Sequence, residues 1–172
     1  MLLAQGEDFL DLFRQAKREA FHLEVADDYD TPEESEPFRK FIANEPDDYE
    51  WFTPWLEHVR ETTSRGVAVK RARVVTVPHT DYTRFAKHVA RFNAEAGEDV
   101  RYVPRHTINA DELTKDDWWL FDDERVAFTV FKPSGEWSGG AVTDDPVIVD
   151  YVRRVKNLVW SKATPLGEYS DQ

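Results

Sequence analysis

The chain has 172 residues, 41% of them hydrophobic and 13% aromatic, so it is long and apolar enough to bury the core of a single domain. Its formal net charge of −12 argues against direct nucleic-acid binding, because that binding depends on lysine and arginine at phosphates. The absence of cysteine excludes disulfides, thiolate nucleophiles and cysteine-ligated zinc. An acidic surface suits a soluble protein, and it would also complement a basic protein partner.

No targeting or membrane segment is recognisable in the sequence. The residues from Met1 to Phe13 lack the basic segment followed by an apolar segment that marks a signal peptide. No apolar run approaches the roughly 20 residues that a membrane helix requires. We therefore predict a cytoplasmic protein that does not bind membranes.

The N-terminal part, residues 8–63, is predicted to be helical. Apolar residues between 8 and 25 recur at spacings of three and four, which predicts one face of an amphipathic helix. The residues on that face are Phe9, Leu12, Phe13, Ala16, Ala20 and Leu23.

A loop and a second helix are expected to complete the N-terminal part. The acidic stretch 27–36, with Pro32 near its centre, is typical of a loop, and residues 38–42 are typical of a helical turn. Residues 51–63 are predicted to form a helix, since a Thr-Pro pair lies near its start and Gly66 follows its end.

The remaining part, residues 66–162, is predicted to run strand, helix, strand, hairpin, helix. Residues 67–77 give the strongest strand signal in the chain. A helix over 82–96 follows, with Asp81 as its expected N-cap. A short strand over 100–103 comes next.

The hairpin is predicted from an aromatic run that stops at an acidic turn. The run begins at Trp118 and ends at Asp122-Asp123, and a second β-rich run over 126–131 follows at once. Neighbouring strand residues point to opposite faces, so Trp118 and Trp119 must lie on different faces of the sheet.

The order of elements indicates an α/β fold, with α+β as the alternative. We expect a single domain over 1–172 with a mixed sheet, N-terminal helices and a C-terminal helix over 147–162 that starts at Asp145-Pro146. Residues 67–77 should form a central strand covered on both sides. Residues 163–172 are expected to be a loose tail.

Two arginines lie at unusual positions in the central strand. Alternation places Arg71 and Arg73 on one face together with four valines, which are Val67, Val69, Val75 and Val77. A half-buried guanidinium is costly unless it is paired. One interpretation is a structural ion pair with Asp122 or Asp123; the other is an anion pocket, since guanidinium binds carboxylate and phosphate bidentately.

Arg101 and Arg105 extend the same hypothesis. Alternation places both on one side of the next strand. If that strand is the neighbour of 67–77, four arginines would gather near one edge or face of the sheet. We expect a small anionic ligand, if one binds, where the C-terminal part of 67–77 meets strand 100–105 and the Asp122-Asp123 turn.

Motifs for familiar catalytic chemistry do not occur. The five histidines show no HxH or HExxH spacing, the serines show no GxSxG motif, and the glycines form no GxGxxG or Walker A loop. We predict no metal, no cofactor and no catalytic residue. If the protein were an enzyme, Asp122 or Asp123 would be the expected acid or base.

Three long segments resemble a family of actinobacterial domains of unknown function. These segments are residues 9–29, 66–105 and 116–137. Members of that family are often encoded beside, or fused to, XRE-type helix-turn-helix regulators, so the resemblance implies such a regulator as partner. The positions that match its most recognisable residues are Arg71, Arg73, Asp81, Tyr82, Asn93, Gly97, Glu98, Arg101, Arg105, Trp119, Asp122 and Asp123.

The order of elements is also distantly similar to one half of the phospholipase D fold, whose motif is HxKxxxxD. Placing the motif's aspartate on Asp122 puts Lys115 and Asp117 at the histidine and lysine positions. Placing it on Asp123 puts Asp116 and Trp118 there. Neither frame supplies the nucleophile, so the likeness implies a degenerate half domain without that activity.

These observations favour a non-enzymatic regulatory or protein-interaction module that acts with a helix-turn-helix regulator or another basic protein. The alternative is a small-molecule hydrolase or transferase that holds an anionic substrate with its arginines and uses an aspartate as acid or base.

Overall fold

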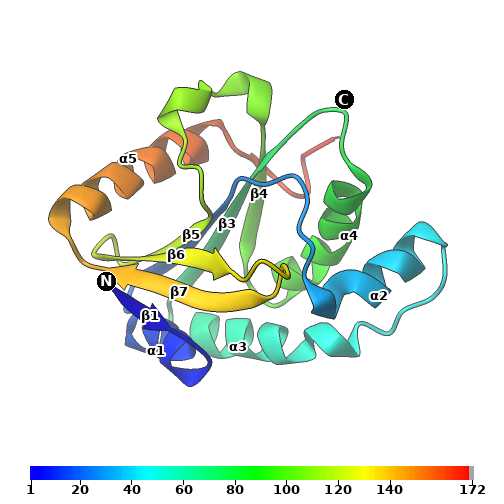
Figure 1. The fold of residues 1–172 in the computed structure, drawn as a ribbon, viewed down its shortest axis with the longest axis horizontal. Coiled ribbons are helices and arrows are strands. Elements are labelled where there is room, and N and C mark those ends of the chain that lie inside the picture. The colour runs from blue at the N-terminus through cyan, green and yellow to red at the C-terminus, as the bar shows by residue number, and fades with distance from the viewer. Residues whose placement is uncertain (171–172) are drawn as a thin grey trace.

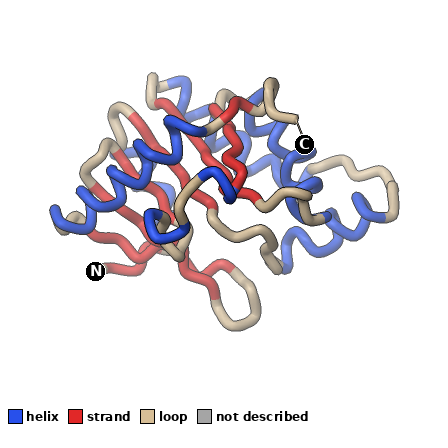
Figure 2. Tube along the Cα trace, turned by 90° about the horizontal axis from the view of Figure 1, so that it is seen from above, coloured by secondary structure: helices blue, strands red, loops and turns tan. Residues whose placement is uncertain are grey.

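The computed structural model describes residues 1–170, which form one mixed eight-stranded sheet with helices on both faces (Figures 1 and 2). Three neighbouring strands, β2, β3 and β4, run parallel, and every other pairing is antiparallel. In order across the sheet, the strands are β1 (Leu2–Ala4), β7 (Trp137–Thr143), β6 (Arg125–Phe131), β5 (Trp118–Phe121), β2 (Glu19–Glu24), β3 (Ala68–Val75), β4 (Asp99–Pro104) and β8 (Thr164–Pro165).

The helices divide between the two faces of the sheet. The long C-terminal helix packs on one face, where its valines contact a core that includes Leu23, Val74 and Trp118. The other helices cover the opposite face or its margin (Figure 1). They are α1 (Glu7–Gln15), α2 (Pro32–Ile42), α3 (Thr53–Ser64) and α4 (Asp81–Glu95), and the C-terminal helix is α5 (Pro146–Lys162).

The predicted α/β class and mixed sheet are confirmed, and β3 is an interior strand between β2 and β4. The alternation along β3 is confirmed as well. Val69 packs in the core on the α1 side, whereas Ala72 and Val74 pack in the core beneath α5. Arg71 and Arg73 therefore lie on the face that α5 does not cover.

The predicted helix over 8–25 is wrong in its second half, because α1 ends at Gln15 and residues 19–24 form β2. This strand is covered on both faces, so its apolar residues do not alternate cleanly with polar ones. Phe21 and Leu23 face the α5 core, and Ala20 faces the opposite core.

Smaller differences arise at the ends of elements. Pro32 begins α2 instead of lying in the middle of a loop, since a proline fits the first turn of a helix. The N-cap of α4 is Thr80, not Asp81: its hydroxyl accepts a bond from the backbone N–H of Thr83 at 3.1 Å. The hairpin is confirmed, and Asp145 caps α5 as expected.

The expected loose tail is wrong for the residues that the structure describes. Residues 164–165 form β8 against β4, and the ring of Tyr169 stacks on that of Tyr102 at 4.8 Å between centroids. Residues 171–172 lie outside the described part. Within residues 1–170, no helix has the length and apolar character to span a bilayer.

Candidate functional site

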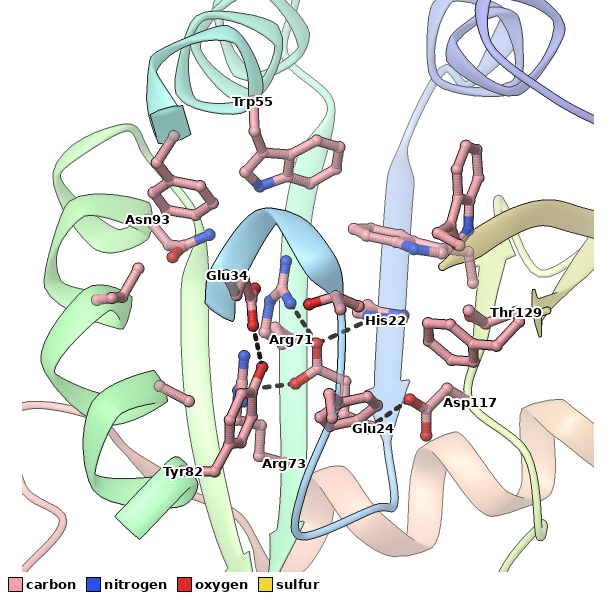
Figure 3. Close-up of a pocket in the computed structure, with 18 of the residues that line it drawn as sticks. His22, Glu24, Glu34, Trp55, Arg71, Arg73, Tyr82, Asn93, Asp117 and Thr129 are labelled. Carbon is pink, nitrogen blue, oxygen red and sulfur yellow. Dashed lines mark hydrogen bonds and ion pairs between the residues drawn. The ribbon is translucent and has the colours of Figure 1, made fainter. Parts of the chain in front are cut away.

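A cavity of about 480 Å³ lies over the sheet on the face away from α5 (Figure 3). Its size is within the roughly 300–1,000 Å³ typical of small-molecule pockets. Side chains of β2, β3, β5 and β6 form its floor, and residues from α1, α3 and α4 form its walls. Thr31 and Glu34, next to and within α2, line it as well.

The floor carries a carboxylate shared by two arginines. One oxygen of Glu24 lies 2.5 Å from Nη1 of Arg71, and its other oxygen lies 2.7 Å from Nε of Arg73 (Figure 3). Parallel pairing of β2 and β3 sets this arrangement, since Glu24 is the register partner of Arg73. Burial raises the pKa of Glu24, but the charges of Arg73 and Arg71 outweigh it and hold that pKa far below its usual value. Glu24 is therefore ionised at neutral pH.

Arg71 has a second carboxylate partner. Its Nε lies 2.6 Å from Oε1 of Glu98, which immediately precedes β4 and is 3% exposed. Asn93 of α4 donates to the other oxygen of Glu98 at 2.7 Å. Arg71 is thus held between two buried carboxylates. It is itself buried, as a charged residue can be when both of its counter-charges are buried with it.

The ion pair of Arg73 with Glu24 runs through its Nε atom. Among residues 1–170, neither of its two Nη nitrogens forms a hydrogen bond, although its side chain is only 16% exposed. Next to it on β4, the hydroxyl of Tyr102 is buried without a hydrogen-bond partner in the described structure. Burial raises the pKa of Tyr102 to about 12, so this hydroxyl keeps its proton at neutral pH.

His22 connects the charged floor to an aromatic wall. Its ring stacks on Trp119 at 4.3 Å with an angle of 5° between the planes. Its Nδ1 lies 2.9 Å from the carbonyl oxygen of Trp118, and its Nε2 lies 3.2 Å from Glu24. Both ring nitrogens therefore face acceptors.

Two further carboxylates line the cavity, and each already accepts a tyrosine hydroxyl. Asp117 accepts from Tyr29 at 2.5 Å and from the backbone N–H of Val25 at 2.7 Å. Burial and the charge of Glu24 raise the pKa of Asp117. Glu34 accepts from Tyr82 and so joins α2 to α4 across the cavity.

The walls are mostly aromatic. Trp55 of α3 points into the cavity above Arg71, with its indole nitrogen turned inward (Figure 3). Other rings complete the walls, and they are Phe9, Phe52, Phe85, Trp119, Phe131 and Trp137. Such walls suit the faces and edges of a ring-containing molecule.

Comparison with known proteins places the chain in a family. A family model described as a domain of unknown function (DUF6879) matches residues 7–171. The chain belongs to this family. No curated protein matches the sequence.

A solved structure similar to this DUF6879 domain is TrmBL2, described as an archaeal chromatin protein with a novel mode of DNA binding. The identity is 12% and the TM-score is 0.49. The match covers 90% of this chain and 48% of that chain, so the domain spans about half the length of TrmBL2.

The four arginines predicted to gather are separated in this DUF6879 domain. Arg71 and Arg73 line the cavity. Arg101 lies on the α5 face, 3.9 Å from the ring centre of Trp160, and pairs with Asp99 at 2.9 Å. The expectation failed because Arg101 is the register partner of Ala72. Arg101 therefore lies on the α5 face of the sheet, opposite to Arg71 and Arg73.

Arg105 lies at the carboxyl end of the sheet, beyond β4. It donates to the backbone carbonyls of Val25 at 2.6 Å and Val74 at 3.1 Å, and it lies 3.4 Å from a carboxylate oxygen of Asp27. These contacts tie the ends of β2 and β3 together. Arg105 does not line the cavity.

The Asp122-Asp123 turn is at the other end of the sheet from Arg105, beside the start of β2. The carboxylate of Asp122 accepts the backbone N–H groups of Lys17 and Arg18 at 2.8 Å and of Glu19 at 2.9 Å. Asp123 pairs with Lys156 at 2.6 Å. The expectation that this turn meets the arginines is therefore wrong, and neither aspartate pairs with Arg71 or Arg73.

Asp122→Ala should lower the free energy of unfolding by about 1–3 kcal/mol, because three backbone donors lose a charged acceptor. Asp122 also has a φ of 53°, which alanine tolerates poorly. Chemical denaturation would measure the loss. Asp122→Asn, which keeps one acceptor oxygen, should lie between alanine and wild type. A loss no larger than that of the exposed Asp144→Ala would contradict this role.

Several cavity residues were missed because β2 was read as helix. His22 and Glu24 fall on the strand face only when residues 19–24 alternate with a period of two. Part of that alternation is present, since His22 and Glu24 alternate with Phe21 and Leu23, but Ala20 interrupts it. Within residues 1–170, no group of three or more metal-binding side chains is clustered.

Proposed function

We propose that this domain is a cytoplasmic regulatory module that binds a small molecule in the cavity over β2 and β3. The observation that carries the proposal is the combination of an aromatic cavity with polar groups that lack partners. Arg73 and Thr31 both line the cavity. Among the described residues, neither the Nη nitrogens of Arg73 nor the hydroxyl of Thr31 has a hydrogen-bond partner. An apolar pocket with a few convergent polar groups is the usual form of a ligand site.

The state of the carboxylates supports binding rather than catalysis. A general acid or base works best with a pKa near neutral pH and with access to the reacting atom. Glu24 has a strongly lowered pKa and is shared by two arginines, and Asp117 has both oxygens occupied. The hydrolase or transferase alternative placed acid–base chemistry on Asp122 or Asp123, and neither lines the cavity.

A helix-turn-helix regulator remains the proposed partner, with another basic protein as the wider class. The support is the resemblance to domains encoded beside such regulators and the net charge of −12. Co-purification with the regulator encoded beside this chain would test it. Recovery of the domain alone at physiological salt would count against the partner. The distant likeness to half of a phospholipase D fold also stays a prediction.

Filling the cavity from α4 should abolish ligand binding. Ala86 lines the cavity and is 5% exposed, so Ala86→Phe places a ring inside it. A thermal-shift screen of small ring-containing compounds should yield ligands that stabilise wild type and fail to stabilise Ala86→Phe. Ala94→Phe, on the exposed side of the same helix, should respond as wild type does. Hits that stabilise all three proteins equally would place binding elsewhere and refute the proposal.

A further inference from the structure

The two arginines of the cavity differ in how many of their donors are used. Arg71 bonds Glu98 through Nε and Glu24 through Nη1. Arg73 pairs with Glu24 through Nε, and no described residue forms a hydrogen bond with either of its Nη nitrogens. A guanidinium presents five N–H donors in a planar fork that matches a carboxylate, so the free edge of Arg73 is a ready bidentate site.

Other donors in the cavity also lack acceptors. Among the described residues, the indole N–H groups of Trp55 and Trp119 form no hydrogen bond, although both residues line the cavity. The acceptors beside them are already used, since Glu24 is held by two arginines and Asp117 and Glu34 each accept a tyrosine hydroxyl. The surplus of donors favours a ligand that brings acceptor atoms.

The charge balance limits how negative that ligand can be. Three carboxylates line the cavity together with two arginines, and Glu98 lies just behind Arg71. The positive charge of Arg73 is already shared with Glu24, so its free Nη edge offers two N–H donors but can accept at most one negative charge. A dianionic phosphate would meet the field of Glu24 and Glu34 as well, which disfavours it.

Building on the proposed small-molecule function, we infer that the ligand is an aromatic compound with one carboxylate, and that Arg73 binds this carboxylate through its two Nη nitrogens. The ring lies among the aromatic walls formed by residues such as Trp55, Phe85 and Trp119. Arg71 keeps its two carboxylate partners and positions Glu24, which in turn fixes the plane of the Arg73 guanidinium.

Four probes of the same ring system test the class of ligand on the wild-type protein. Calorimetric titration would compare 2-naphthoate, 2-naphthamide, 2-naphthylmethylamine and 2-naphthyl phosphate. We expect 2-naphthoate to bind about tenfold more tightly than the neutral amide, because it gains two charge-assisted bonds. The amine and the phosphate should bind more weakly than 2-naphthoate.

A matched pair of arginine variants tests the assignment to Arg73. Arg73→Gln should reduce the affinity for 2-naphthoate to that for the amide, whereas Arg101→Gln, on the opposite face of the sheet, should leave it unchanged. Arg73→Lys keeps the charge without the fork and should lose most of the preference. It serves as the second variant if glutamine at position 73 prevents folding.

The outcomes separate this inference from the proposed function. Tightest binding of the amide, the amine or the phosphate would overturn the carboxylate class, while binding in the cavity would stand. Ring-containing hits from the thermal-shift screen, with no binding of 2-naphthoate, would also overturn it. If no compound binds wild type in a manner sensitive to Ala86→Phe, both fail together.

Discussion

Arg71→Met is expected to lower the free energy of unfolding by about 3–5 kcal/mol, because removing one partner of a buried ion pair leaves its counter-charges unpaired. The loss should be large because two carboxylates depend on this residue. Glu24 lies 2.5 Å from its Nη1, and Glu98, which is 3% exposed, lies 2.6 Å from its Nε. Urea denaturation of both proteins at pH 7 measures the difference.

An exposed ion pair provides the matched control. Arg84 pairs with Asp81 at 2.7 Å on the surface of α4, and both side chains are largely exposed. Arg84→Met should therefore change the stability by no more than about 1 kcal/mol. Arg71→Met combined with Glu98→Leu should recover part of the lost stability, since the second change removes one of the two buried carboxylates that are left without their arginine. Equal effects of Arg71→Met and Arg84→Met would show that the buried pairing contributes little.

Glu24→Gln should destabilise the protein at pH 7, and the deficit should shrink in acid. The folded-state pKa of Glu24 lies far below its unfolded value, because the charges of Arg73 and Arg71 outweigh the effect of burial. A carboxylate of this kind contributes stability above its unfolded pKa, about 4.3, and loses it as the pH falls toward the folded pKa. The stability gap between wild type and Glu24→Gln should thus be about 1–2 kcal/mol smaller at pH 3 than at pH 7.

Comparing the two proteins cancels the contributions of carboxylates that do not interact with Glu24, such as Asp27 and Asp122, whose pKa values are lowered. Asp117 does not cancel fully, because the charge of Glu24 is one cause of its raised pKa. Glu57, an exposed residue of α3, offers a neutral control as Glu57→Gln. A gap that stays constant or widens between pH 7 and pH 3 would mean that Glu24 is not held ionised by its arginines.

The sequence predicts the α/β class and the elements β3, α4, β4, β5, β6 and α5, because their signals are local, but it does not predict β7. Residues 68–75 are rich in valine, and α4 is bounded by a capping residue and a glycine. The sequence does not predict β2, because both faces of this strand are buried and apolar residues therefore do not alternate regularly with polar ones. It also does not predict the short β1 and β8, which form only by pairing with distant strands.

The candidate site was predicted only in part, because it depends on strand pairing that the sequence does not reveal. Alternation correctly placed Arg71 and Arg73 on one face. Their carboxylate partners are 47 and 27 positions from Arg71, in β2 and before β4, and no local pattern distinguishes them from the acidic turn at Asp122. The same dependence on register put Arg101 on the wrong face.

The central claim is that a small molecule binds in the cavity on the Arg71 and Arg73 face. The most direct test follows the indole N–H resonances of the tryptophans by NMR during titration with 2-naphthoate and ring-containing hits from the thermal-shift screen. Binding in the cavity should shift Trp55, Trp119 and Trp137, which line it. It should leave unchanged Trp118, which lies beneath α5, and Trp160, which is part of α5. Shifts confined to Trp118 and Trp160, or no shifts at saturating ligand, would contradict the account.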